Sequence, residues 1–142
     1  MIVETGNIWS AFNDAHIIAI PSCSTTKDGR LVMARGLARQ VNEAHPGIDF
    51  VFGAIINTLF GSEGYFDFLY LTQIMQEEYK KFDLIQTKRR YMNGIEEAMV
   101  IRGLWSIQAI ANYNPDKEIH TVFFKGVDMS HLPDNVYAWK RK

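Results

Sequence analysis

Residues 20–40 read IPSCSTTKDGRLVMARGLARQ, and they join a short apolar run to an amphipathic segment. Just before them, residues 16–20 form a nearly continuous β-branched run that ends at Pro21, which predicts a strand buried on both faces. Apolar residues then recur at helical spacing over residues 31–44, and the sequence HPG at 45–47 ends that pattern. A buried strand, a loop and a helix in this order are the unit from which parallel α/β sheets are built.

The flanking sequence repeats this alternation of strands and helices. A long helix is predicted over residues 95–113, where Asn93 and Glu96 have the spacing of a capping box. Three further apolar runs predict strands: residues 2–4, 82–87 and 119–124. Strands that alternate with helices imply right-handed crossovers. We therefore expect one α/β domain over residues 1–142, in three layers, with a mixed, largely parallel sheet flanked by helices.

Two aromatic-rich segments, residues 50–60 and 65–71, are separated by a turn at residues 61–64. Their periodicity does not distinguish strands from buried helices. Their aromatic side chains fit a core, the wall of a ligand pocket or an oligomer interface, and core packing is favoured because aromatic residues dominate burial.

The charge balance bears on possible partners. Lysines and arginines number 15 and aspartates and glutamates 16, which gives a formal net charge of -1. This balance argues against a protein whose main task is to neutralise a nucleic-acid backbone. The basic run at residues 88–90 fits either phosphate binding or a solvated turn, and residues 140–142 are expected to form a short basic tail.

Cysteine, carboxylate and hydropathy patterns exclude several other classes. The single cysteine, Cys23, forms no internal disulfide, which favours a reducing environment. Asp28 and Asp128 have no second carboxylate nearby in sequence, so we expect no metal site, and no cofactor is indicated. The first residues lack the pattern of a signal peptide, and no stretch is long and apolar enough for a membrane helix. We expect a cytoplasmic protein without a membrane partner.

Ligands of parallel α/β sheets bind beyond the carboxyl ends of the strands. Two loops meet this condition: residues 22–35, which follow the first buried strand, and the loop after Phe124. The first loop is rich in small polar residues, which let backbone amides approach an anion closely. Both loops are therefore candidates for an anion site.

Three separated segments resemble the macro-domain superfamily of ADP-ribose binders, most of all its small bacterial and phage members. They are GNI at residues 6–8, the 20–40 segment quoted above, and FDLIQTKRRYM at residues 82–92. The MARGLARQ part, residues 33–40, carries most of the likeness. The resemblance implies a three-layer macro-like fold and a pocket for an ADP-ribose-like nucleotide.

The resemblance also implies which residues contact the nucleotide. Adenine is expected near Asn7 and Ile8, and the distal ribose near Ser22, Cys23 and Ser24. The diphosphate is expected between two loops, with the following residues: Gly29, Val32, Met33, Ala34, Arg35 and Gly36 in the first, and Lys125 and Gly126 in the second.

The sequence departs from the family pattern at four of these places. Asn7 stands where relatives commonly have an aspartate that contacts adenine, and Cys23 stands where relatives place the asparagine that holds the distal ribose. Ala34 replaces a usual glycine. The second loop, which is rich in glycine in relatives, has only one here, Gly126. Phosphate binding through backbone donors survives such changes better than hydrolysis, which needs a positioned water molecule.

Three functions remain open. The first is a binding module for ADP-ribose or a derived nucleotide, which would sequester a nucleotide signal in the host cytoplasm if the chain is phage-encoded. The second is a hydrolase that removes ADP-ribose or phosphate from an ADP-ribosyl compound. The third is a ligand-free structural or nucleic-acid-associated subunit, although the net charge disfavours a nucleic-acid partner. The sequence leaves open the oligomeric state, turnover and the exact nucleotide.

Overall fold

The computed structural model describes residues 1–13, 15–26, 28–61, 66–71, 81–89 and 94–142. Along the chain the elements are β1 (Ile2–Thr5), η1 (Ile8–Ala11), β2 (Ile17–Ser22), α1 (Gly36–Ala44), α2 (Ile48–Phe60), β3 (Phe68–Tyr70), β4 (Phe82–Gln86), α3 (Glu97–Tyr113), β5 (Ile119–Val122) and β6 (Val136–Lys140).

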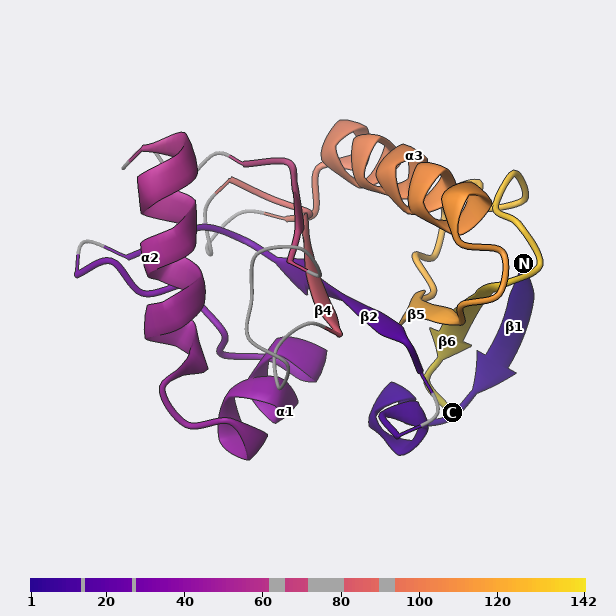
Figure 1. Ribbon diagram of the computed structural model, residues 1–142, viewed down its shortest axis with the longest axis horizontal. Helices are drawn as coiled ribbons and strands as arrows, with labels where there is room; N and C mark the ends of the chain where they lie inside the picture. The colour runs from indigo at the N-terminus through magenta and orange to yellow at the C-terminus, as the bar shows by residue number, and fades with distance from the viewer. Residues whose placement is uncertain (14, 27, 62–65, 72–80, 90–93) are drawn as a thin grey trace.

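The strands form one six-stranded sheet in the order β1-β6-β5-β2-β4-β3. All neighbouring strands are parallel except β3, which runs antiparallel to β4 at one edge. Helices η1, α1 and α2 contribute to the hydrophobic cluster on one face, and α3 contributes to the cluster on the other (Figure 1). The predicted three-layer α/β fold with a mixed, largely parallel sheet is confirmed.

Side chains of β2 explain why a continuous apolar run forms the centre of the sheet. Ile18 and Ile20 pack in the cluster with α1 and α2, whereas Ile17 and Ala19 pack in the cluster with α3. Successive side chains of a strand point to opposite faces, so a strand covered on both sides needs apolar residues at every position. The prediction of burial on both faces is confirmed, and β2 continues through Pro21 to Ser22.

The helix predicted over residues 31–44 is shorter in the structure, because α1 begins at Gly36. The backbone N–H of Leu31 donates to the carbonyl oxygen of Asp49 at 2.9 Å, so this segment bonds across to α2 rather than along a helix. Leu31 and Met33 are nevertheless buried. Both residues are apolar because they are buried in the core, and their spacing in the sequence resembles that of a helix although the backbone there is a loop.

The C-terminal residues 140–142 are not the tail that the sequence predicts. Lys140 ends β6, a strand that was not predicted from the sequence and that lies between β1 and β5. The strand predicted over residues 119–124 is also shorter, since β5 ends at Val122 and Phe123 and Phe124 follow it.

The remaining boundaries are close to the predictions. Residues 50–60 lie within α2, and part of the second aromatic segment forms β3. The long helix α3 begins at Glu97 rather than Ile95, and Asn93 of the predicted capping box lies outside the described residues. Within the described part of the chain, no helix combines the length and the apolar character needed to cross a membrane.

A close approach at Gly53 fixes the loop after β2 against α2. A Cβ atom at Gly53 would lie 1.8 Å from the carbonyl oxygen of Gly29, so no larger residue fits without moving the loop. Leu31, two positions further along the chain, bonds to the same helix. The helix therefore sets the path of the loop that leads to α1.

Candidate functional site

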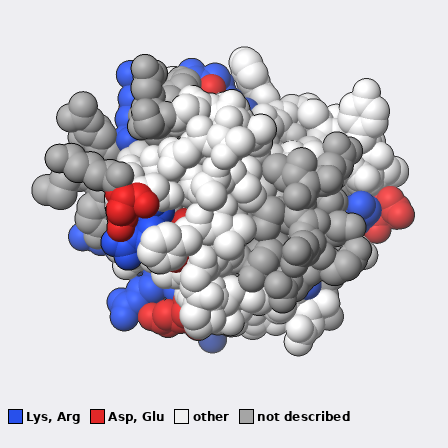
Figure 2. All heavy atoms as spheres, turned by 60° about the vertical axis from the view of Figure 1, so that its left-hand side comes forward, with Lys and Arg blue, Asp and Glu red and all other residues white. Residues whose placement is uncertain are grey.

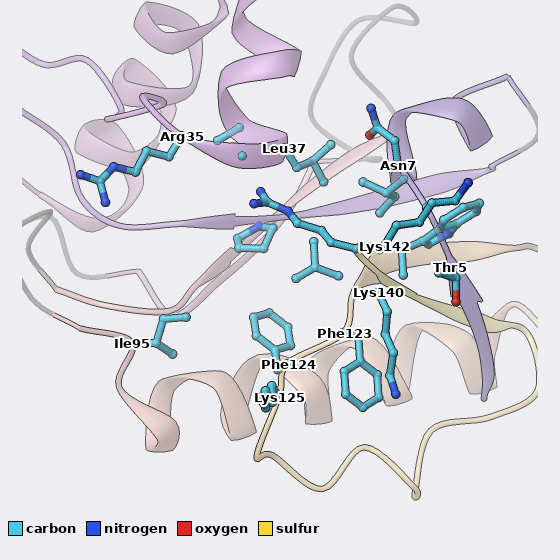
Figure 3. A pocket seen from close by; sticks show the side chains of 18 of the residues that line it. Thr5, Asn7, Arg35, Leu37, Ile95, Phe123, Phe124, Lys125, Lys140 and Lys142 are labelled. Carbon is cyan, nitrogen blue, oxygen red and sulfur yellow. The ribbon is translucent and has the colours of Figure 1, made fainter.

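The carboxyl ends of the parallel strands lie at one edge of the sheet, and a cavity of about 1570 Å³ opens there (Figure 3). Four segments from distant parts of the sequence line most of it: residues 5–8 from the end of β1, 35–38 at the start of α1, 122–127 from the end of β5, and 139–142 at the end of β6. This is the place at which parallel α/β sheets bind ligands. The fold therefore brings both predicted loop regions to a single cavity.

Positive charge dominates this cavity. Its cationic lining residues are Arg35, Lys125, Lys140, Arg141 and Lys142, and all five are exposed. Glu97 is the one carboxylate among the described lining residues. A concave surface with charges of one sign attracts ligands of the opposite sign, so the cavity favours an anion.

The start of α1 adds backbone donors to these charges. The preceding residue, Arg35, makes no side-chain hydrogen bond that caps the helix. Gly36 has a φ of 56°, and a Cβ atom there would lie 3.2 Å from Nη2 of Arg141. The first N–H groups of a helix lack partners within it and attract anions. A guanidinium group and a helix N-terminus thus lie next to each other in the cavity.

Aromatic residues form another part of the wall, and one of them is held by hydrogen bonds. Phe123, Phe124 and Trp139 line the cavity. The indole Nε1–H of Trp139 donates to Nδ1 of His120 at 2.9 Å, and Nε2 of His120 lies 3.0 Å from Oε1 of Glu118. These contacts require the imidazole proton on Nε2, which donates to Glu118. The orientation of the Trp139 ring is therefore fixed from behind the cavity.

Asn7 has a structural role that the sequence did not reveal. Its Oδ1 accepts from the backbone N–H of Trp9 at 3.0 Å and so caps η1. The amide NH₂ takes no part in this cap. The next residue, Ile8, is buried and lines the cavity.

A smaller cavity of about 160 Å³ adjoins the first, and Pro21, Arg35, Ala38 and Ile95 line both. Cys23 lines the smaller one, and its carbonyl oxygen accepts from Nε2 of Gln86 at 2.9 Å. Burial raises the pKa of the Cys23 thiol, although the nearby Ser24 backbone and the charge of Lys88 oppose that shift. A thiol with a raised pKa is a weak nucleophile at neutral pH.

The predicted ligand residues fall into three groups. Asn7, Ile8, Arg35, Gly36, Lys125 and Gly126 line the large cavity. Ser22, Cys23, Val32 and Ala34 line the small one. Ser24, Gly29 and Met33 line neither. Contact of any of these residues with a ligand remains a prediction.

Physical reasons place the third group away from the cavities. Met33 is buried in the core, and Gly29 lies against Gly53 of α2. The carbonyl oxygen of Ser24 accepts from the N–H of Val32 at 3.0 Å, which closes the loop on itself. These residues shape the loop that carries the lining residues.

The contribution of the C-terminal segment to the cavity was not among the predictions from sequence. Trp139 and the three basic residues after it line the cavity, as do Phe123 and Phe124. The β-branched and aromatic residues of VYAWK, residues 136–140, are typical of a strand and were the available signal.

The described part of the basic run, Lys88 and Arg89, does not line the large cavity. Arg89 donates from its backbone N–H to Oε2 of Glu96 at 3.1 Å, and its Nε lies 3.7 Å from Oε1 of that residue. Lys88 lines the small cavity, and Arg90 lies outside the described residues.

The aromatic segments are divided between core and surface. Phe52 and Phe66 are buried in the core, as favoured, whereas Phe50 and Phe60 on α2 are 54% and 42% exposed. Figure 2 shows this end of the molecule, where few charged side chains are visible. None of the described aromatic residues in these segments lines the large cavity.

No protein-family model matches the sequence, and no curated protein matches it. Solved structures are similar to it. The macrodomain of Thermus aquaticus DarG matches with a TM-score of 0.59 and 13% identity, over 99% of this chain and 98% of that one. The macrodomain of Mycobacterium tuberculosis DarG matches with a TM-score of 0.61 and 14% identity, over 97% and 96%.

A third match is Thermosipho africanus DarTG, whose structure is a complex with ADP-ribose. Its TM-score is 0.63 at 19% identity, and the match covers 98% of this chain but 41% of that larger protein. At identities this low, the likeness is one of fold.

Proposed function

Because the chain has the macrodomain fold, we propose that it binds ADP-ribose or a nucleotide derived from it in the large cavity. The observation that carries this proposal is the combination, at the strand ends, of aromatic walls, a helix N-terminus and an excess of cations. Aromatic faces suit a base, and backbone donors with guanidinium groups suit phosphates.

Each part of the nucleotide has a matching part of the cavity. The diphosphate would lie at the start of α1, between Gly36 and Arg141. Adenine would lie beside Asn7 and Ile8, and the distal ribose would extend toward the small cavity at Cys23. One nucleotide can occupy both cavities in this way because they adjoin.

Binding without turnover is the better-supported activity. Phosphate affinity from backbone N–H groups does not depend on side-chain identity, whereas hydrolysis needs a water molecule aligned with the bond that breaks. Cys23, which stands where relatives carry the ribose-holding asparagine, is a buried thiol with a raised pKa. The proposed role is to sequester an ADP-ribose-derived nucleotide.

Titration calorimetry with ADP-ribose tests this proposal. Lys125 lines the cavity and has no ion-pair partner among the described residues. Lys125→Glu should therefore preserve the fold and weaken binding at least about tenfold. Lys117→Glu is the matched control, because Lys117 precedes β5 at the opposite edge of the sheet and lines neither cavity. Its affinity should stay within about twofold of the parent value.

Absence of ADP-ribose binding by the folded parent protein would contradict the proposal, as would equal losses in the two variants. Binding without turnover and hydrolysis are distinguished by incubating the protein with the nucleotide, or with an ADP-ribosylated protein, and separating the products by chromatography. Released ADP-ribose or phosphate that depends on Lys125 would favour the hydrolase instead.

A further inference from the structure

We infer that His120, which lines neither cavity, positions Trp139 for the nucleotide, and does so only while its imidazole is neutral. The affinity of the large cavity for its nucleotide therefore falls when this ring takes up a proton. The inference rests on the proposed function, because the ligand affected is the same nucleotide. The contacts of the His120 ring carry it.

Burial and strand pairing hold the His120 ring in one place. His120 lies in β5, is 3% exposed and is the register partner of Tyr137 in β6. The two rings stack, with centroids 4.5 Å apart and an interplanar angle of 6°. Trp139 lies two residues beyond Tyr137 and so points to the same face of the sheet, where its Nε1 is 2.9 Å from Nδ1 of His120.

Trp139 is the member of this network that lines the large cavity. A Cβ atom at Gly6 would lie 3.9 Å from Cζ3 of Trp139, so the indole also packs against the segment that leads to Asn7. Asn7 and Ile8 line the part of the cavity where adenine is proposed to bind. The position of the indole therefore affects the proposed adenine end of the site.

Protonation of His120 breaks the hydrogen bond that holds Trp139. An indole N–H can only donate, so Nδ1 of His120 accepts and carries no proton. In the imidazolium ion both ring nitrogens donate. Two donors would then face each other across 2.9 Å in a buried place, which disfavours this arrangement. The indole has to move, and the wall of the cavity changes with it.

Few charged groups among the described residues lie near this ring. Oε1 of Glu118 is 3.0 Å from Nε2 of His120, and the backbone N–H of Glu118 donates to Nδ1 of the exposed His16 at 2.9 Å. The elements η1 and β2 carry no titratable side chain. On β6, Tyr137 stacks on the ring, and the Lys140 ammonium lies over an aromatic ring on the α3 side. The charge of Glu118 thus favours the imidazolium ion, whereas the indole N–H favours the neutral ring.

Calorimetry with ADP-ribose at pH 7.5 and pH 5.5 tests the inference, because histidine is the side chain whose charge ordinarily changes in this range. The parent protein should bind at least about fivefold more weakly at pH 5.5, the loss expected when a base loses a stacking contact. His120→Asn keeps an acceptor for Trp139 and gains no proton, so its affinity should be equal at the two pH values. The control His131→Asn changes an exposed histidine outside both cavities and should behave as the parent does.

The indole N–H resonance of Trp139 follows the same event without a nucleotide, and its absence from Trp139→Phe identifies it. This resonance should shift between pH 7.5 and pH 5.5 in the parent and stay in place in His120→Asn. Glu118→Gln still accepts from Nε2 of His120 but has no negative charge, so the shift should occur at lower pH. A role of His120 in packing alone would not depend on this charge.

The outcomes separate the two proposals. Equal affinity of the parent at the two pH values, an equal loss in His120→Asn, or an indole resonance that does not move overturns the inference and leaves the proposed function intact. Absence of ADP-ribose binding at both pH values overturns both. If His120→Asn does not fold, the resonance in the parent and in Glu118→Gln decides.

Discussion

Asp83→Asn should remove most of the pH dependence of stability between pH 5 and pH 7. Asp83 lies in β4 and is completely buried. Its Oδ1 accepts from the backbone N–H of Leu71 at 2.9 Å, whereas Oδ2 has no hydrogen-bond partner among the described residues. Burial raises the pKa of this carboxyl from 3.8 to about 8, and the bond from Leu71 opposes only part of that shift. The side chain is therefore neutral in the folded protein at pH 7.

The sign of the effect follows from proton binding. Between pH 4 and pH 8 the folded state keeps the proton of Asp83 and the unfolded state releases it, so stability falls as pH rises. The contribution is fully present below the unfolded pKa and is lost up to the folded pKa. Each pH unit in this interval costs about 1.4 kcal/mol, so the loss by pH 7 is about 4 kcal/mol.

Asparagine imitates the protonated acid at every pH. Its carbonyl oxygen still accepts from Leu71, and it has no charge to lose. Urea unfolding at pH 5, 6, 7 and 8 should show a free energy of unfolding whose slope differs between parent and variant by about 1.4 kcal/mol per pH unit. Asp116→Asn, at an exposed position, should leave the slope of the parent unchanged.

Parallel pH profiles for the parent and Asp83→Asn would refute the reasoning, because they would mean that Asp83 is ionised in the folded protein. A variant that is less stable at pH 8 than the parent would refute it too. A uniform offset at all pH values would show only a packing difference and would still contradict the predicted slope.

Three further predictions concern packing, the thiol and the basic run. Gly53→Ala should lower the free energy of unfolding, measured with urea, by about 2 kcal/mol or more, because its Cβ would overlap the backbone of Gly29. The control Gly94→Ala has open space around its Cβ and should not lower it. Cys23 should react with iodoacetamide at pH 7 at least about tenfold more slowly than free cysteine, as followed by mass spectrometry, and rapid labelling would contradict the raised pKa. DNA binding, measured by fluorescence anisotropy, should be nearly independent of salt and should not change when Arg89 and Arg90 are neutralised. A site for a nucleic-acid backbone would instead make log affinity fall with log salt concentration, with a slope of about 0.7 to 0.9 per phosphate contacted.

Local patterns predicted the elements whose signal lies within a few residues. The β-branched run of β2 and the apolar residues around α3 each lie within one element, and each reflects how that element is buried. The same kind of reasoning failed at residues 31–35, where core burial in a loop has the spacing of a helix. Apolar spacing reports burial, and only hydrogen bonds to distant partners show whether the backbone is helical.

For the candidate site too, some residues were predicted correctly from the sequence and others were not. The loop residues Arg35 and Gly36 were predicted from a segment continuous in sequence, and they do line the cavity. Gly29 was predicted from the same segment, yet its contact with Gly53 of α2 places it elsewhere. Contacts between elements distant in sequence decide which residues of a loop face a ligand.

By itself, the sequence determined the α/β class, the buried central strand and the loop that leads into α1. Only the tertiary structure showed that Trp139 and residues 140–142 meet residues 5–8 at one cavity. Parallel strands do not pair through a local turn, so their pairing depends on crossovers and on the burial of a whole sheet. The pairing of β1 with β6 joins the two ends of the chain, and no short pattern in either segment specifies that partner.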